Sequence, residues 1–188
     1  YMLETETFFK ARQEIVDKFG RLECRPCAMA GHAYPEDGDQ LSKKLDKMLD
    51  KAEKPAFEGD PVALIAPHID LSLGREAYGI AYKAISDVKY DRIIILGVGH
   101  NLANNLFSIT DKDFDTPIGQ VDCDRETVAS LRQSAGHLIT QDDFPHCHEH
   151  SIEFQAVILK HIYGDDTPPI ARIDHLDDQP LVHAEHGL

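Results

Sequence analysis

The sequence predicts an α/β fold with a central, mostly parallel or mixed sheet flanked by helices. Two continuous apolar runs, residues 62–66 and 93–96, have the length of strands that are buried on both faces. Between them, residues 74–86 place apolar side chains at helical spacing: Ala77, Ile80, Ala81, Ala84 and Ile85. A strand, a helix and a second strand over this length form a βαβ unit, which predicts two parallel strands joined by a right-handed crossover.

The same periodicity predicts further elements along the chain. Helices are expected over residues 5–19, over 41–52 after a cap at Asp37 or Asp39, around Val128 and Leu131 after Asp122 or Asp124, and over 151–163 before Gly164. Residues 106–109 predict another strand. A chain of 188 residues fits one domain, which would bury about 70% of the surface of the unfolded chain.

Composition argues against several classes of function. The chain has 19 basic and 33 acidic residues, and its net charge of −14 disfavours nucleic acid as a partner. No apolar run approaches the ~20 residues of a membrane span, and the first residues lack the features of a signal peptide, so we expect a cytoplasmic protein without a membrane partner. We expect Cys24 and Cys27 to be reduced thiols; a redox pair or half a zinc site is the alternative interpretation of their C-x-x-C spacing.

Histidines follow both apolar runs at the point where each predicted strand ends. His68 comes after Pro67, and His100 comes after Gly97-Val98-Gly99. The carboxyl ends of adjacent parallel strands lie at one edge of a sheet, so we expect the two rings to meet in one cleft and to hold a metal. Imidazole suits zinc, copper and iron. The alternatives are hydrogen-bonded loop histidines, or a dinucleotide fingerprint whose third glycine is replaced by Leu102.

A third cluster precedes the last predicted helix. His150 and Glu153 are three residues apart, and on a helix they share one face. Ordinary capping by Ser151, with solvated histidines, is the alternative interpretation. Because His68 and His100 are expected nearby, we assign His150 and Glu153 to the site and regard His146 and His148 as surface residues.

Five segments together resemble the Memo family, which includes the bacterial "AmmeMemoRadiSam system protein B" members. They are RPCAMAGHAYP at 25–35, APHID at 66–70, LGVGH at 96–100, FDTPIG at 114–119 and EHSIE at 149–153. That family is structurally related to class III extradiol ring-cleaving dioxygenases, whose non-haem iron is held by two histidines and a glutamate. The resemblance implies that fold, with an N-terminal helical extension over 1–24 and a Memo-like α/β domain over 25–188.

The resemblance also implies a metal-dependent oxidoreductase of the dioxygenase type. His68 and His100 match metal-binding histidines, and His150 matches a cleft histidine, so we expect His150 and Glu153 to be catalytic. The cofactor would be one iron or copper ion, with zinc possible, and the partner a small-molecule substrate. A non-catalytic module that binds a peptide in the same cleft is the alternative, and a zinc hydrolase ranks behind both because no H-E-x-x-H helix is present.

The chain departs from the Memo pattern after Ile170. Later family motifs, an Asp-Phe-x-His type segment and a cysteine in a Cys-Gly stretch, are not found in this sequence. We therefore expect the Memo-like domain to be incomplete beyond about residue 170, or to omit a segment between Ile170 and Ala171. His175, His183 and His186 are alternative candidates for a third metal ligand.

Overall fold

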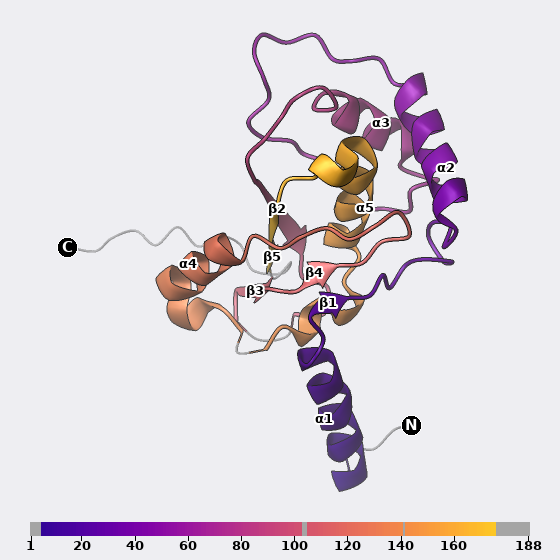
Figure 1. The fold of residues 1–188 in the computed structure, drawn as a ribbon. Coiled ribbons are helices and arrows are strands. Elements are labelled where there is room, and N and C mark those ends of the chain that lie inside the picture. Colours follow the sequence, from indigo (N-terminus) through magenta and orange to yellow (C-terminus); the bar gives the residue numbers. More distant parts are fainter. Residues whose placement is uncertain (1–4, 103–104, 141, 176–188) are drawn as a thin grey trace, which may run out of the picture.

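A computed structural model describes residues 5–102, 105–140 and 142–175 of the chain (Figure 1). Its helices are α1 (Glu6–Gly20), α2 (Gly38–Lys51), α3 (Arg75–Lys83), α4 (Arg125–Ala135) and α5 (Ser151–Tyr163), with short 3-10 turns η1 (Gly136–Leu138), η2 (Phe144–His148) and η3 (Gly164–Asp166). Its strands are β1 (Cys24–Arg25), β2 (Ile93–Val98), β3 (Phe107–Thr110), β4 (Asp113–Phe114) and β5 (Ile170–His175). The predicted α/β class is confirmed.

The central sheet is mixed and has the strand order β2-β5-β3. β2 runs parallel to β5 with Ile95 opposite Arg172, and β3 runs antiparallel to β5 with Ile109 opposite Ile173. A separate parallel pair joins β1 to β4. β5 therefore occupies the centre of the sheet, and β2 forms one edge of it.

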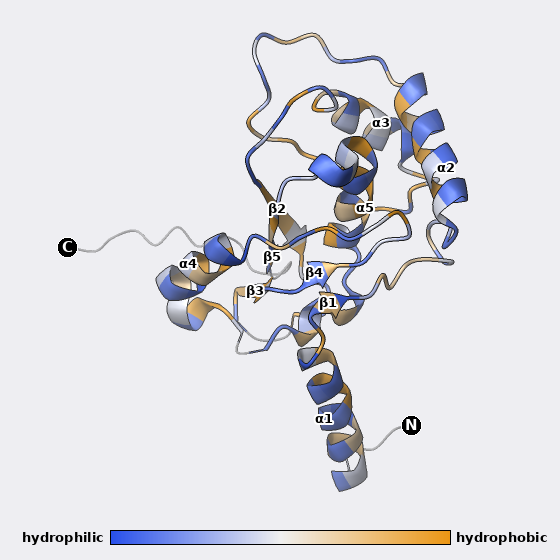
Figure 2. Ribbon diagram, viewed as in Figure 1, coloured by the Kyte–Doolittle hydropathy of each residue, from blue (hydrophilic) through white to orange (hydrophobic). Residues whose placement is uncertain are grey.

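Helices cover both faces of this sheet. On one face, α5 packs with α2 and α3 into the main core, which includes Ile95, Ile152 and Ile170. On the other face, α4 contributes Val128 to a smaller cluster with Ile109 and Ala171. Alternate residues of β5 thus enter opposite cores, as a pleated strand requires. Figure 2 shows β2 in the colours of apolar residues and the outer side of α2 in those of hydrophilic ones.

The helix α1 projects away from this body (Figure 1). Of its residues only Phe19 is buried, and it packs edge-on against Phe144 of η2. Phe9 and Ile15 of α1 remain about half exposed, at 53% and 56%. Among the described residues, no helix has both the length and the apolar character needed to span a bilayer.

One predicted strand is wrong. Residues 62–66 are irregular, and Val62 and Ile65 are 100% and 96% exposed. The parallel neighbour of β2 is β5, which is far along the chain and carries the charged Arg172 and Asp174 in its middle. An apolar run indicates burial but does not identify its pairing partner, because pairing is decided by tertiary contacts.

Most predicted helices are confirmed, with small shifts. Asp37 caps α2 and Asp124 caps α4, each through its side chain. Within α3 the buried residues are Tyr78, Gly79 and Tyr82, whereas Ile80, expected inside, is 45% exposed. The large tyrosine rings, rather than the small alanines, fill the space against the core. All four cysteines are free.

The junction between Ile170 and Ala171, where an omitted segment is expected from the sequence, lies within β5. β5 passes through Ile170 and Ala171 as one unbroken strand, and both side chains are buried. That the Memo-like domain is incomplete beyond about residue 170, or omits a segment at this junction, stays a prediction.

Candidate metal centre

Three histidines meet at the end of β2 and the start of α5. The ring centroids of His68 and His100 are 5.3 Å apart, those of His68 and His150 are 5.9 Å apart, and His100 stacks on His150 at 4.5 Å. Each ring offers a nitrogen, and these three nitrogens all lie within 4.8 Å of one another. The predicted proximity of His68 and His100 is confirmed, although His68 arrives on an irregular segment rather than at the end of a strand.

Close packing of β2 against α5 brings His100 and His150 together. A Cβ at Gly97 would lie 2.7 Å from the Ser151 Oγ and 2.6 Å from Asp174 Oδ1, so only glycine lets the strand come this near. The hydroxyl of Ser151 accepts a hydrogen bond from the N–H of Val98 at 2.9 Å. These contacts hold the end of β2 on the first turn of α5, where His150 is the N-cap residue.

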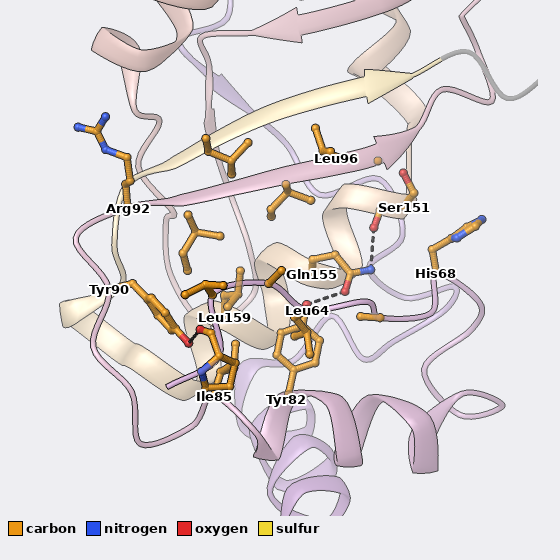
Figure 3. A pocket seen from close by; sticks show the side chains of 18 of the residues that line it. Leu64, His68, Tyr82, Ile85, Tyr90, Arg92, Leu96, Ser151, Gln155 and Leu159 are labelled. Atoms are coloured by element: carbon orange, nitrogen blue, oxygen red, sulfur yellow. Dashed lines mark hydrogen bonds between the residues drawn. The ribbon is translucent and has the colours of Figure 1, made fainter. Parts of the chain in front are cut away.

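His68 is brought to the same place by α5. The Nε2 of Gln155 donates hydrogen bonds to the carbonyl of Pro67 at 3.0 Å and to the carbonyl of Ser151 at 2.9 Å. The Oε1 of Gln155 accepts a hydrogen bond from the hydroxyl of Tyr82 at 2.6 Å. Gln155 therefore fixes the residue directly before His68 to α5, whose N-cap residue is His150. Figure 3 shows Gln155 between Tyr82 and Ser151.

Glu149 contacts two of the three clustered histidines, His100 and His150, and it was not assigned to the site from the sequence. Its Oε1 lies 2.9 Å from Nδ1 of His100, and its Oε2 accepts the backbone N–H of His100 at 3.0 Å. Oε1 also accepts the N–H groups of His150 and Ser151, at 2.8 and 2.9 Å. Burial alone would raise the pKa of Glu149, but the hydrogen bonds from Ser151 and His100 outweigh it and lower that pKa. The sequence feature that could have indicated this role is the position of Glu149 directly before His150.

This arrangement bears on the form of two of the imidazoles, those of His100 and His150. In the neutral ring of His100, a hydrogen bond from Nδ1–H to Glu149 leaves Nε2 with its lone pair for a metal ion. Burial lowers the pKa of His150, and the neighbouring His100 and His68 lower it further, against the opposing effect of Glu149. His150 is thereby favoured as the neutral ring, which is the form that binds metals.

Glu153 does not belong to the histidine cluster. Its carboxylate is fully buried and forms an ion pair with Nη1 of Arg25 at 2.5 Å. It also accepts the backbone N–H groups of Ala28 at 3.0 Å and Met29 at 2.8 Å, and the hydroxyl of Tyr34. Burial raises the pKa of Tyr34, and the nearby Glu153 carboxylate raises it further. Both oxygens of Glu153 are thus engaged with the segment that follows β1.

The other histidines named from the sequence lie elsewhere. His148 is exposed as predicted, but the prediction that His146 is a surface residue is wrong, because His146 is fully buried. His146 belongs to η2, and its Nδ1 lies 2.8 Å from Oδ2 of Asp174 in β5. His175 lies against the ring of Phe107 at 5.5 Å. His183 and His186 lie outside the described residues.

A pocket of about 380 Å³ runs along β2 and ends at His68 (Figure 3). Its walls are the β2 residues, the segment 61–66, and side chains from α3 and α5 that include Tyr82 and Leu159. Several polar side chains in these walls are hydrogen-bonded, as in the bond from the hydroxyl of Tyr90 to the carbonyl of Pro61 at 2.6 Å. The walls therefore present mainly carbon atoms toward the histidine cluster.

Comparison with known proteins agrees with these features. A family profile described as "Memo-like protein" matches residues 25–173, which include all three clustered histidines. The chain belongs to the Memo-like family. A MEMO1 family protein of Aquifex aeolicus is 30% identical over 189 residues, covering 100% of this chain and 50% of the relative.

Two archaeal relatives match a smaller part of this Memo-like chain. MEMO1 family proteins of Methanopyrus kandleri and Nitrosopumilus maritimus are 30% and 26% identical over 151 and 146 residues, in each case 75% of this chain and 53% of the relative. The chain therefore spans about half the length of the curated relatives that it matches.

Proposed function

We propose that His68, His100 and His150 hold one transition-metal ion. The observation that carries this proposal is the convergence of three imidazole nitrogens within 4.8 Å of one another. Two nitrogens bound to the same first-row metal ion lie closer to each other than 4.8 Å, because each metal–nitrogen bond is about 2.0–2.1 Å long. A modest inward rotation of the three rings would bring their nitrogens within bonding distance of one ion. Each ring is partly exposed or exposed rather than buried in the core.

The side chains fit iron or copper, with zinc as a further candidate. Imidazole is a good ligand for all three metals, and three of them leave positions open for substrate or water. When bound, such an ion would supply Lewis acidity and, for iron or copper, redox chemistry. The chain's own contribution is to orient His100 through Glu149 and to keep His150 neutral, as described above.

We propose the reaction class of a non-haem, metal-dependent oxidoreductase related to extradiol ring-cleaving dioxygenases, acting on a small molecule. Membership of the Memo-like family and the three-histidine cluster support this class. The same proposal includes the fold. The region matched by the family profile, residues 25–173, would have an α/β fold of the extradiol dioxygenase type, and α1 would be an N-terminal extension of it. Since its carboxylate is fully engaged by Arg25 and its neighbours, Glu153 is proposed to hold the segment after β1 against α5 rather than to act in catalysis.

Elemental analysis of protein purified under mild conditions tests the proposal. The native chain should carry iron, copper or zinc at up to one ion per molecule, and His68→Ala, His100→Ala and His150→Ala should each lose most of it. His161→Ala is the matched control, because His161 pairs with Asp46 at 2.9 Å away from the cluster. Unchanged metal content in the three cluster variants would overturn the proposal.

The alternative function is a module that binds a peptide in the same cleft without a metal. The apolar pocket that ends at His68 is the observation that favours it. Peptide binding that survives chelation and His68→Ala would support this alternative, whereas loss of binding on chelation would favour the metal centre.

A further inference from the structure

Arg25 ends the short strand β1 and is completely buried, with no contact to the histidine cluster. A buried guanidinium must place its N–H groups on acceptors, because each unpaired buried donor costs free energy. Nη1 of Arg25 uses the carboxylate of Glu153, as described above. The N–H groups on Nε and Nη2 find their acceptors elsewhere, on two backbone carbonyls of the segment that leads into α5.

These two carbonyls belong to the junction between η2 and α5. Nε of Arg25 donates to the carbonyl of His146 at 2.7 Å, and Nη2 donates to the carbonyl of Glu149 at 2.6 Å. Within the described part of the chain, no other hydrogen bond reaches the Glu149 carbonyl. Since Glu149 is buried, replacement of Arg25 would leave this carbonyl without a partner, which is unfavourable.

The peptide bond between Glu149 and His150 is therefore held at both of its polar groups. Its C=O accepts the hydrogen bond from Arg25, and its N–H donates to Oε1 of the Glu149 side chain at 2.8 Å. A peptide unit is planar, so fixing both groups fixes the orientation of the whole unit. The same Oε1 lies 2.9 Å from Nδ1 of His100. The orientation of this peptide plane thus affects where the carboxylate of Glu149 meets the ring of His100.

The three bonds of Arg25 require the shape of an arginine. A guanidinium is a planar, rigid fork, so one group can serve two carbonyls and a carboxylate in fixed directions. The guanidinium of Arg25 also lies over the ring of Phe114, 4.6 Å from its centre, which fixes the plane of the fork. A lysine could keep a positive charge beside Glu153, but its ammonium group has no planar fork with which to reproduce these directions.

We propose that Arg25 is a positioning residue for the histidine cluster. By holding the carbonyls of His146 and Glu149, it keeps the carboxylate of Glu149 where it orients His100 and His150. The consequence for metal binding rests on the proposed function. Loss of the two carbonyl bonds frees the Glu149–His150 peptide unit to turn, so the carboxylate leaves its place beside His100 for part of the time and the metal site becomes less well ordered.

Hydrogen exchange of the metal-free protein tests the positioning itself. The amides of His100 and His150 both donate to the carboxylate of Glu149. Arg25→Lys should speed their exchange about tenfold, the effect expected from the loss of one hydrogen bond to a charged group. The reference is the amide of Val128, which lies in the separate core cluster of α4, so that a general loss of stability cancels in the ratio.

Glu153→Gln is the matched control for Arg25→Lys. It removes the same buried ion pair but leaves Arg25 its bonds to the two carbonyls. The exchange ratio should therefore stay at the native value in this variant. Because no metal is used, the result is valid whether or not the chain holds an ion.

Zinc affinity, measured by competition with a chromophoric chelator, tests the consequence for the centre. Arg25→Lys should raise the Kd for zinc about tenfold, the lower end of the range for residues that support metal ligands. Glu153→Gln should leave the Kd unchanged. Since Arg25 acts through Glu149, adding Arg25→Lys to Glu149→Gln should have little further effect. A merely structural role would instead change the Arg25 and Glu153 variants alike.

A second variant replaces Arg25→Lys in both measurements if that protein does not fold. Arg25→Gln combined with Glu153→Gln removes the guanidinium without leaving an unpaired buried charge, and it is compared with Glu153→Gln alone.

Three results would contradict the proposal. They are an unchanged exchange ratio for His100 and His150 in the variants that lack Arg25, equal changes in Glu153→Gln, and full additivity of Arg25→Lys with Glu149→Gln. If the native chain binds no zinc but Arg25→Lys still speeds the exchange, the positioning role of Arg25 stands and the proposed function is the part that fails.

Discussion

The carboxylate of Glu149 holds His100 at two points. Oε1 lies 2.9 Å from the ring Nδ1, and Oε2 accepts the backbone N–H of the same residue at 3.0 Å. Because Glu149 is also bonded to the backbone of His150 and Ser151, one buried carboxylate sets the positions of two of the three clustered histidines. The geometry of the centre therefore depends on a residue that would not itself touch the metal.

Replacing Glu149 by glutamine should weaken metal binding without abolishing it. Such supporting partners of histidine ligands typically contribute about 10- to 100-fold in affinity, because they fix the ring and increase its basicity. Competition with a chromophoric chelator measures the change in Kd. Glu76→Gln, an exposed carboxylate on α3, is the control. Equal affinities for the Glu149 and Glu76 variants would show that Glu149 has no role in the centre.

Replacing Glu153 by glutamine should destabilise the fold. The change leaves the guanidinium of Arg25 buried without its ion-pair partner, which typically costs about 3–5 kcal/mol. Urea unfolding of the metal-free protein measures the loss. At temperatures where the variant stays folded, its metal stoichiometry should match that of the native chain. A stable variant that has lost its metal would instead return Glu153 to the centre as a direct participant.

Gly97→Ala should disturb the junction between β2 and α5. The added methyl group would meet buried atoms of Asp174 and Ser151 at 2.6 and 2.7 Å, and relief of such overpacking typically costs about 1–3 kcal/mol. Gly20→Ala is a suitable control, because nothing lies within 4 Å of a Cβ at that position. Thermal unfolding compares the two variants, and a Gly97→Ala protein as stable as the control would contradict the close packing seen here.

Acid should destabilise the metal-free protein partly through His150. Its pKa lies below the ordinary value of 6.5, so the unfolded chain takes up a proton on this ring at a higher pH than the folded chain does. The free energy of unfolding should therefore fall as pH drops below about 6.5. His150→Gln removes this contribution, so the stability of the native chain relative to the variant should decline between pH values of about 7 and 5.5. A constant difference across that range would contradict the lowered pKa.

The sequence was most informative where a local pattern determines local structure. A cap at Asp37 or Asp39 and another at Asp122 or Asp124 were predicted, because a short acidic side chain before an apolar stripe satisfies free N–H groups at a helix start. In the structure Asp37 and Asp124 are the caps. The meeting of His68 and His100 was also predicted, but partly for the wrong reason. Residues 62–66 do not form a strand, and His68 reaches the cluster because Gln155 holds the carbonyl of Pro67.

The remaining features depend on contacts between distant parts of the chain. β5 was not predicted because Arg172 and Asp174 interrupt its apolar pattern. The structure buries Arg172 by directing its guanidinium onto the ring of Phe114, 4.2 Å from the ring centre, and onto the carbonyls of Lys112 and Val121. Such compensation for a buried charge leaves no local signal in the sequence. The same applies to Glu153, whose partner Arg25 is 128 positions away.

X-ray absorption spectroscopy of the chain loaded with one equivalent of zinc or cobalt tests the central claim most directly. The account predicts three imidazole ligands with metal–nitrogen distances of about 2.0–2.1 Å, falling to two in each of His68→Ala, His100→Ala and His150→Ala. A spectrum dominated by sulfur ligands, or an imidazole count that these substitutions leave unchanged, would contradict it.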